Sequence, residues 1–392
     1  MIIKMRYVKI LCCVVFLAAC MFVLGACNSV AISGGDVDAR NFLEEDLYPV
    51  FPVAGERNSF AIMNDGSLWG WGWMQGIPNS PYDSSYQYFP IPVHIWDGVS
   101  YAASSNRNII FLTEDGGLYG FGDNALRLLS QRLGYISFIE PVNIKNNVLN
   151  LSISDSHVLV VDSYNTLWGW GLNFRGQLGD GAEDFSDAPV MIADNVRGIC
   201  ASLGLTSFID FYGTLWQNNE HGVFVPIFYE RAYMVSTSNT HTMIKSENGD
   251  LWVLGDNSYN QLGLEGICYT DVPIKIKQDI ISITANDNTS YAIDINNSLW
   301  VWGNNQGKAA GIEDYETVAT PLPLLAMHNV NHISSNDRTT LALKDNSALL
   351  EWGVRFLGHQ FLDSELVYKT FTEPRKGFYN NFIVDESILM GY

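Results

Sequence analysis

The chain has 392 residues, of which 42 are acidic and 22 basic, giving a formal net charge of −20. Hydrophobic residues make up 47% of the sequence and aromatic residues 13%, enough to bury a substantial core. A surface this acidic repels both nucleic acid and anionic lipid, which excludes a function that depends on a basic binding face.

The first 26 residues have the composition of a secretory signal peptide. Three basic residues and no acid precede an almost wholly apolar run from Ile10 to Ala26, which is short for a membrane-spanning helix. The run ends in Leu24-Gly25-Ala26-Cys27, which resembles the bacterial lipobox. We predict a lipoprotein signal peptide over 1–26 and acylation of Cys27, which places the chain in the bacterial cell envelope, outside the cytoplasm. An uncleaved anchor and an ordinary signal peptide are the alternatives.

Residues 27–47 lack the repeats found later and contain Ser33-Gly34-Gly35. This composition predicts a tether between the lipid and a folded domain over 48–392, with a short ordered strand as the alternative. Beyond Cys27, the predicted mature chain has two cysteines, Cys200 and Cys268. They fall in different repeats, so we expect buried small apolar side chains, with one disulfide as the alternative.

From Asp65 to the C-terminus the sequence repeats one pattern, in which an apolar run and a polar turn precede a leucine, an aromatic residue and glycines. The leucine recurs at Leu68, Leu118, Leu167, Leu215, Leu251, Leu299 and Leu349, with a weaker copy around Leu389. The separations run from 36 to 50 residues, the range of one four-stranded propeller blade. No single blade could bury its own faces, so neighbouring blades must pack together.

Glycines recur in the strand that begins at each leucine, for example Gly169 and Gly171 in the third copy. Glycine weakens a strand interior, so its recurrence predicts the close approach of a backbone or an aromatic ring. We expect the adjacent blade to supply that neighbour.

The segment Trp170-Gly171-Leu172-Asn173-Phe174-Arg175-Gly176-Gln177-Leu178-Gly179 resembles the signature of the regulator-of-chromosome-condensation (RCC1) repeat, WGxNxxGQLG. Residues 255–263 match nearly as well, and two further copies are partial. The first copy loses the signature after Trp73, and the fourth has Gln217-Asn218-Asn219 where glycine, an aromatic and glycine should stand. The resemblance implies an all-β fold, an RCC1-type β-propeller that usually has seven blades.

The two ends of the repeat region predict how the ring closes. Residues 382–389 resemble the start of an eighth hairpin, and residues 48–55 resemble the end of a connector whose beginning is missing. We expect these N- and C-terminal segments to close the ring as one composite blade. Seven blades follow from the family, and eight are the alternative from the number of copies.

The loops differ between copies, and function in such scaffolds usually lies on loops. The loop over 74–90 mixes Tyr with Pro and Ser, a composition typical of protein-binding surfaces. Aromatic residues also follow the Trp-Gly motif or its equivalent in other copies. The predicted partner-binding residues are Trp73, Tyr82, Tyr86, Tyr88, Phe89, Phe174, Tyr259 and Tyr315. The alternative is that these aromatics pack back onto the blades or between them.

The sequence has no GxSxG or HExxH motif and no arguable cysteine–histidine pair. His157 and His241 stand ten residues before their marker leucines, where other copies have varied, mostly polar residues, so we predict a structural hydrogen-bonding role. His328 and His332 are four apart but lack a carboxylate-rich context. We therefore predict no catalysis, no metal and no cofactor.

These features predict a monomeric protein-interaction scaffold, attached to the membrane only through its lipid, that binds an extracytoplasmic protein through blade-edge loops. The nuclear role of the RCC1 family, on chromatin and on a GTPase, is excluded for a secreted acidic chain. The alternative is a lectin-like propeller that binds cell-wall glycan, which the same exposed Trp–Asn pair in five or more blades would favour. An uncharacterised propeller enzyme is the third hypothesis.

Overall fold

The computed structural model describes residues 48–75, 86–124, 126–129, 138–182, 185–305, 319–336, 339–357, 360–363 and 367–369. All of them belong to one compact unit, Asp46–Tyr392. They form strands, turns and loops without a helix, so the prediction of an all-β fold is confirmed. Within these ranges there is accordingly no helix with the length and apolar character that crossing a membrane requires.

The described strands fall into seven successive sheets. The first two blades contain β1 (Pro49–Ala54), β2 (Asn58–Met63), β3 (Leu68–Gln75) and β4 (Tyr86–Trp96), then β5 (Val99–Ser104), β6 (Asn108–Thr113), β7 (Leu118–Gly122) and β8 (Phe138–Lys145). The third and fourth contain β9 (Val148–Ile153), β10 (His157–Asp162), β11 (Leu167–Gly171) and β12 (Ser186–Ala193), then β13 (Val196–Ser202), β14 (Leu205–Asp210), β15 (Leu215–Asn218) and β16 (Phe224–Phe228). The fifth and sixth contain β17 (Ala232–Thr237), β18 (His241–Ser246), β19 (Leu251–Asp256) and β20 (Tyr269–Lys277), then β21 (Ile280–Asn286), β22 (Thr289–Asp294), β23 (Leu299–Asn304) and β24 (Ala319–Met327). The seventh contains β25 (Val330–Asn336), β26 (Thr339–Lys344), β27 (Leu349–Leu357), β28 (Gln360–Asp363) and β29 (Val367–Lys369).

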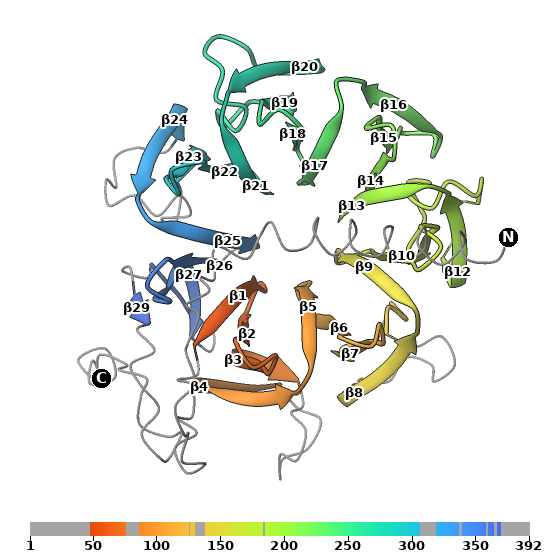
Figure 1. The fold of residues 1–392 in the computed structure, drawn as a ribbon, viewed down its shortest axis with the longest axis vertical. Coiled ribbons are helices and arrows are strands. Elements are labelled where there is room, and N and C mark those ends of the chain that lie inside the picture. Colours follow the sequence, from red (N-terminus) through yellow and green to blue (C-terminus); the bar gives the residue numbers. More distant parts are fainter. Residues whose placement is uncertain are drawn as a thin grey trace, which may run out of the picture. The chain divides into compact units, whose positions relative to one another are not determined.

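The seven sheets follow one another around a ring, with the first strand of each blade innermost (Figure 1). Neighbouring strands within a blade pair antiparallel, and the first six blades each have four strands. In the seventh blade, β27 pairs with β26, β28 and β29. The predicted seven-bladed propeller is confirmed.

The repeated leucine has one structural role in all seven blades. Each copy is the first residue of its blade's third strand, and each is 0% exposed. These residues are Leu68, Leu118, Leu167, Leu215, Leu251, Leu299 and Leu349. The prediction that a strand begins at each repeated leucine is therefore confirmed, and the structure shows that this strand is the third of its blade.

The repeated glycines are explained by close contacts within their own blade, and at two of them the adjacent blade contributes as expected. A Cβ on Gly171 would lie 2.8 Å from the side chain of Leu128 in the second blade, and one on Gly303 would lie 3.2 Å from the backbone of Gln261 in the fifth. Gly171 has a φ of 111°, and a Cβ there would lie 2.6 Å from the carbonyl oxygen of Ser156, in the turn between β9 and β10. A Cβ on Gly169 would meet the side chains of Leu159, Leu178 and Ile192, all in the third blade. Glycine here lets the third strand lie against its own sheet and turn.

The hydrophobic core lies in the junctions between blades. Separate buried clusters join the third and fourth, fourth and fifth, fifth and sixth, and sixth and seventh blades, while a larger cluster joins the first three. A further cluster, including Trp71 and Leu341, joins the seventh blade to the first. Each blade is thus stabilised chiefly by its neighbours.

The ring closes by packing between complete blades. At this junction Ser59 Oγ donates to Glu351 Oε1 at 2.7 Å, and the amide of Ala54 donates to Ser334 Oγ at 2.9 Å. The segment around residues 48–55 contributes β1, which pairs with β2 in the first blade. The described strands therefore form no composite blade, and the predicted hairpin over 382–389 lies outside the described residues.

An aspartate-based turn connects the second and third strands in several blades. In the third blade, Asp162 Oδ1 accepts hydrogen bonds from the amides of Tyr164 and Thr166, and its Oδ2 accepts one from Trp168 Nε1 at 2.8 Å. The fourth and sixth blades repeat this arrangement. The fifth blade has Ser246 at the position of the aspartate, and Trp252 Nε1 is buried there without a hydrogen-bond partner.

Candidate functional site

The ends of a blade differ, because antiparallel pairing places alternate connections at opposite ends. We call the end that carries the loops between third and fourth strands the loop end, for example residues 172–185. The opposite end, which carries the turns between second and third strands, for example residues 163–166, is the turn end.

The structure brings together part of the predicted partner-binding set at the loop end. Trp73 in β3 lies opposite Tyr88 in β4, with ring centroids 5.6 Å apart, and Tyr88 is 44% exposed. Phe89 is partly buried and packs against the core of the first three blades. Tyr86 begins β4, but its side chain lies outside the described residues, as do Tyr82, Tyr315 and the predicted lipidation site Cys27.

Two other predicted residues lie on the corresponding loops of other blades. Phe174 is 63% exposed and follows β11, while Tyr259 is 43% exposed and follows β19. They lie on the loop ends of the third and fifth blades, separated by the fourth. Their assignment to a binding surface remains a prediction, and their exposure leaves them accessible to a partner.

The RCC1-like signature builds the loop that carries Phe174. Asn173 is fully buried; its Oδ1 accepts the amide of Leu178 at 2.8 Å, and its Nδ2 donates to Asp180 Oδ1 and to the carbonyl of Ala182. Gln177 Oε1 accepts the amide of Arg175 at 2.9 Å. Asn257 and Gln261 make equivalent bonds in the fifth blade. The signature polar residues therefore satisfy buried backbone groups.

This loop inserts side chains between blades. Leu178 and its counterparts Leu129 and Leu262 are at most 1% exposed. An aromatic residue in the third strand of the following blade packs against this loop. Trp170 Nε1 in the third blade donates to the carbonyl of Leu128 in the second blade at 3.0 Å, and Trp302 Nε1 in the sixth donates to that of Gln261 in the fifth at 2.9 Å. A leucine and an aromatic ring thus fill these junctions.

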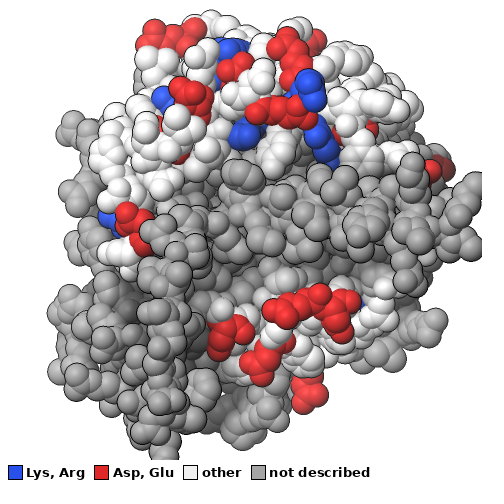
Figure 2. Space-filling model, viewed as in Figure 1, with Lys and Arg blue, Asp and Glu red and all other residues white. Residues whose placement is uncertain are grey.

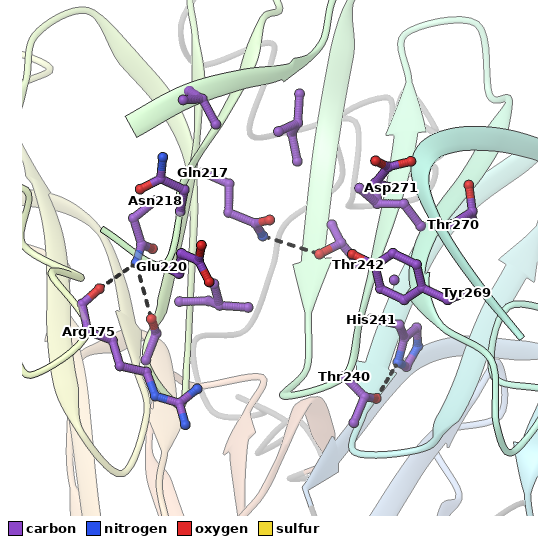
Figure 3. Close-up of a pocket in the computed structure, with 17 residues that line it drawn as sticks. Arg175, Gln217, Asn218, Glu220, Thr240, His241, Thr242, Tyr269, Thr270 and Asp271 are labelled. Carbon is purple, nitrogen blue, oxygen red and sulfur yellow. Dashed lines mark hydrogen bonds between the residues drawn. The ribbon is translucent and has the colours of Figure 1, made fainter. Parts of the chain in front are cut away.

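The junction between the fourth and fifth blades lacks both the loop leucine and the aromatic ring. The fourth blade passes from Asn218 to Phe224 through a short connection, residues 219–223, with no counterpart of Leu178. On the facing side, the fifth blade has Leu254 where the third has Trp170 and the sixth has Trp302. The junction therefore contains a cleft of about 660 Å³ (Figure 3).

Leu205, Val225, Ile227 and Leu254 give the cleft apolar walls. Gln217, at the position of Gly169, bridges the junction, since its Nε2 donates to Ser207 Oγ at 2.9 Å in its own blade and to Thr242 Oγ1 at 3.3 Å in the next. The apolar surface comes from both blades, which matches the composition of ligand-binding clefts.

The polar groups deep in the cleft already have partners. Asn218 Oδ1 accepts the amide of Thr206, and its Nδ2 donates to the carbonyls of Arg175 and Gly204. His241 is buried, with Nδ1 2.9 Å from Ser238 Oγ and Nε2 2.7 Å from Ser290 Oγ of the sixth blade. These contacts leave the inner wall little free hydrogen-bonding capacity.

The mouth of the cleft carries the charged groups. Arg175, Glu220 and Asp271 line it together with Tyr269, which is 65% exposed (Figure 3). On the face drawn in Figure 2, acidic groups are spread widely and basic groups gather mainly in the upper part of the view. The mouth is thus polar around a mostly uncharged interior.

The two histidines at the repeated position make structural hydrogen bonds, as the sequence predicts, and the structure shows that these bonds link neighbouring blades. His157 Nε2 lies 2.8 Å from Thr206 Oγ1 in the fourth blade, just as His241 contacts Ser290 in the sixth. Burial lowers the pKa of His157 to about 3 and that of His241 to about 4. Both rings are therefore neutral near pH 7, and each hydrogen bond stabilises a junction.

Cys200 and Cys268 are both free thiols. The thiol of Cys200 is close to the backbone of Thr237, whose amide donates to Sγ at 3.3 Å, and burial raises its pKa. Cys200 is partly buried and Cys268 is exposed, so the expectation that both are buried was wrong for Cys268. In the described ranges, no group of three or more His, Cys, Asp or Glu side chains is arranged to hold a metal.

The cleft was not among the predicted sites, although the sequence contained its signal. The marker leucines of the fourth and fifth blades, Leu215 and Leu251, are only 36 residues apart, and the fifth copy has Leu254 where most other copies have a large aromatic residue. The missing residues belong to the loop that would cover the junction. Only the packing of neighbouring blades shows that their loss leaves a cleft.

No protein-family model matches the chain. It is 25% identical over 187 residues to the human X-linked retinitis pigmentosa GTPase regulator, which is 45% of this chain and 15% of that protein. It is 21% identical over 287 residues to the RCC1 domain-containing protein RUG3, mitochondrial, of Arabidopsis thaliana, covering 68% of this chain and 56% of RUG3. The chain thus spans well under two thirds of these relatives, and the likeness to RUG3 supports the RCC1-repeat prediction.

Solved structures agree with this comparison. Yeast RCC1 (Prp20), in its complex with Kap60, matches with a TM-score of 0.66 at 16% identity, covering 76% of this chain and 81% of that one. The chain has the fold of an RCC1-type propeller. Human WBSCR16 matches with a TM-score of 0.65 at 14% identity, covering 77% of this chain and 88% of that one. At these identities the RCC1-type likeness establishes the fold alone.

Proposed function

We propose that this RCC1-type propeller is a protein-interaction scaffold whose partner is held at the loop end. The observation that carries the proposal is the contrast between a uniform frame and varied loops. All seven third strands begin with a fully buried leucine, whereas the loops after them differ in length. Phe174 and Tyr259 are exposed on these loops, and Tyr88 is exposed near the start of β4. Exposed aromatics on a rigid frame are typical of protein-binding surfaces.

The similar proteins support the same class of function. Prp20p of Saccharomyces cerevisiae, which matches with a TM-score of 0.65, is described by its binding to Gsp1p and histones, and yeast RCC1 (Prp20) is also seen bound to Kap60. The human relative is named as a GTPase regulator. We extend from these only that a propeller of this kind can bind proteins. That this chain has no catalysis of its own is part of the proposal.

The proposed location rests on the sequence. The apolar leader ending in Cys27 supports a lipid-anchored, extracytoplasmic protein of a bacterial envelope. The net charge of −20 argues against a nucleic-acid partner and for a partner with a basic contact surface.

The tryptophans argue against the lectin-like alternative. All eleven lie in the described part of the chain, and each is buried or only partly exposed. The exposed Trp–Asn pair that would mark a repeated sugar site therefore does not occur in five blades. Protein binding is the better supported of the two classes.

Affinity capture with the full chain tests the proposal. The chain, tagged at its C-terminus and purified from membranes, is incubated with envelope extract of the producing organism and, separately, with purified cell-wall glycan. One set of exposed aromatics at the loop end is replaced by serine: Tyr88, Phe174 and Tyr259. A matched control replaces three exposed tyrosines at the turn end: Tyr164, Tyr212 and Tyr229.

We expect one protein to be captured by the wild type and by the turn-end control, and to be lost with the loop-end variant. Retention on glycan alone, competed by free sugar, would contradict the scaffold. Loss of the captured protein with the turn-end control alone would place the contact on the opposite end.

A further inference from the structure

We infer that the cleft between the fourth and fifth blades is an anchor pocket for a single aromatic side chain carried by the protein partner. The inference rests on the proposed scaffold function and specifies one contact of it. The pocket opens between the loop ends of the two blades, beside Arg175 and Tyr269.

The shape of the occupant follows from the other junctions. At the position of Leu254, five blades place a large aromatic residue that is at most 3% exposed: Trp71, Phe121, Trp170, Trp302 and Trp352. Such a ring normally packs between its own blade and the loop of the preceding blade, as the bond from Trp170 Nε1 to Leu128 illustrates. Where the fifth blade has Leu254 and the fourth has lost its loop, the space that a ring and a leucine would fill is open.

The chemistry of the walls favours an aromatic ring over a sugar. Leu205, Val225, Ile227 and Leu254 provide apolar contact from both sides. The side-chain amide of Asn218 and both nitrogens of His241 are committed to bonds within the protein. Hydroxyls of a sugar that faced this inner wall would find few partners, which is unfavourable, whereas a ring requires none.

The mouth suits the polar edge of such a ring. Glu220 and Asp271 line the mouth, and Glu220 has a side chain that is 87% exposed. Each carboxylate can accept the N–H of an indole or the O–H of a phenol, as main-chain carbonyls do for Trp170 and Trp302. An aromatic residue in a largely desolvated pocket is also the commonest kind of interface anchor. A volume of about 660 Å³ lies within the range of small-ligand sites and admits a ring with its backbone.

The test uses 5-fluoroindole as the probe, titrated into the full chain and followed by fluorine NMR. Leu254→Trp restores the residue type of other blades and is expected to fill the pocket. Leu254→Met is the matched control, because it conserves volume and leaves the cleft open. Val225→Phe obstructs the opposite wall and serves if Leu254→Trp fails to melt cooperatively.

We expect saturable binding to the wild type and to Leu254→Met, and at least a tenfold weaker association with Leu254→Trp or Val225→Phe. Equal binding to the filled variants, or no binding to the wild type, would overturn the inference. Saturable binding of methyl β-glucoside in place of the indole would also overturn it, in favour of a sugar site.

The capture experiment separates this inference from the proposed function. If Leu254→Trp binds no fluoroindole yet captures the partner with unchanged affinity, the scaffold function stands and the anchor pocket is refuted. If the wild type binds fluoroindole but captures no protein, the proposed function fails. The inference that the cleft anchors a protein partner then fails as well.

Discussion

Acidification is expected to destabilise the propeller through two buried histidines. His157 and His241 are at most 2% exposed, and each spans a blade junction through a hydroxyl of the next blade. Burial lowers their pKa values from 6.5 to about 3 and about 4. In the unfolded chain both imidazoles return to a pKa near 6.5 and take up protons below that pH, while the folded chain does not.

The sign and size of the effect follow. The stability is fully present above about pH 6.5 and falls as the pH drops towards the folded pKa values, by about 1.4 kcal/mol per pH unit for each histidine. Between pH 7 and pH 5 this amounts to about 2 kcal/mol each and about 4 kcal/mol together. Burial lowers the pKa of His332, which adds in the same direction, and raises that of Asp287, which opposes it.

Urea unfolding followed by circular dichroism at pH 7, 6 and 5 measures this directly. The wild type should lose about 4 kcal/mol between pH 7 and pH 5. A variant with His157→Gln and His241→Gln should be less stable at pH 7 but lose far less on acidification. An equal loss in the double variant and the wild type would refute the assignment of the pH dependence to these rings.

Three further outcomes are expected from single substitutions and from labelling. Trp170→Ala should lower the free energy of unfolding by about 3–5 kcal/mol, because it leaves a cavity in the junction between the second and third blades. Tyr212 is 87% exposed, so Tyr212→Ala should change the free energy of unfolding by less than about 0.5 kcal/mol, and comparable losses in the two variants would contradict the packing. Ser246→Asp should raise stability by about 1 kcal/mol by giving Trp252 Nε1 an acceptor, and a decrease in melting temperature would count against it. Iodoacetamide should modify Cys268 in the folded chain but should modify Cys200, in β13, only after unfolding. Mass spectrometry of the peptides would show which thiol is labelled.

The sequence predicted the frame well because the frame is a repeated physical requirement. Leu167 and its equivalents must be buried at the start of the third strand, and Asn173 and Gln177 must satisfy the backbone of a tight loop, so the same residue types recur. The hydrogen-bonding role of His157 was also predictable, because it occupies a mostly polar position that recurs in every blade, whereas the structure alone shows that its bond reaches the next blade.

The cleft and the ring closure could not be predicted in the same way. The cleft arises because residues are missing from a loop, and the only trace of this in the sequence is the short interval between Leu215 and Leu251. The walls of the cleft come from segments of two blades that are distant in the sequence. The terminal segment around residues 48–55 resembles an incomplete connector in isolation, yet β1 pairs with β2 along most of its length, with one register shift between Pro49 and Phe51. The exposure of Cys268 depends on a loop whose path the repeat does not determine.

Hydrogen–deuterium exchange of the full chain, alone and with its captured partner, tests the scaffold most directly. We predict slower exchange in the bound state at the loop end, over residues 172–182 and 257–268, with no change at turns 163–166 and 211–214. Protection confined to those turns, or no protection anywhere in the complex, would contradict a partner held by the blade-edge loops.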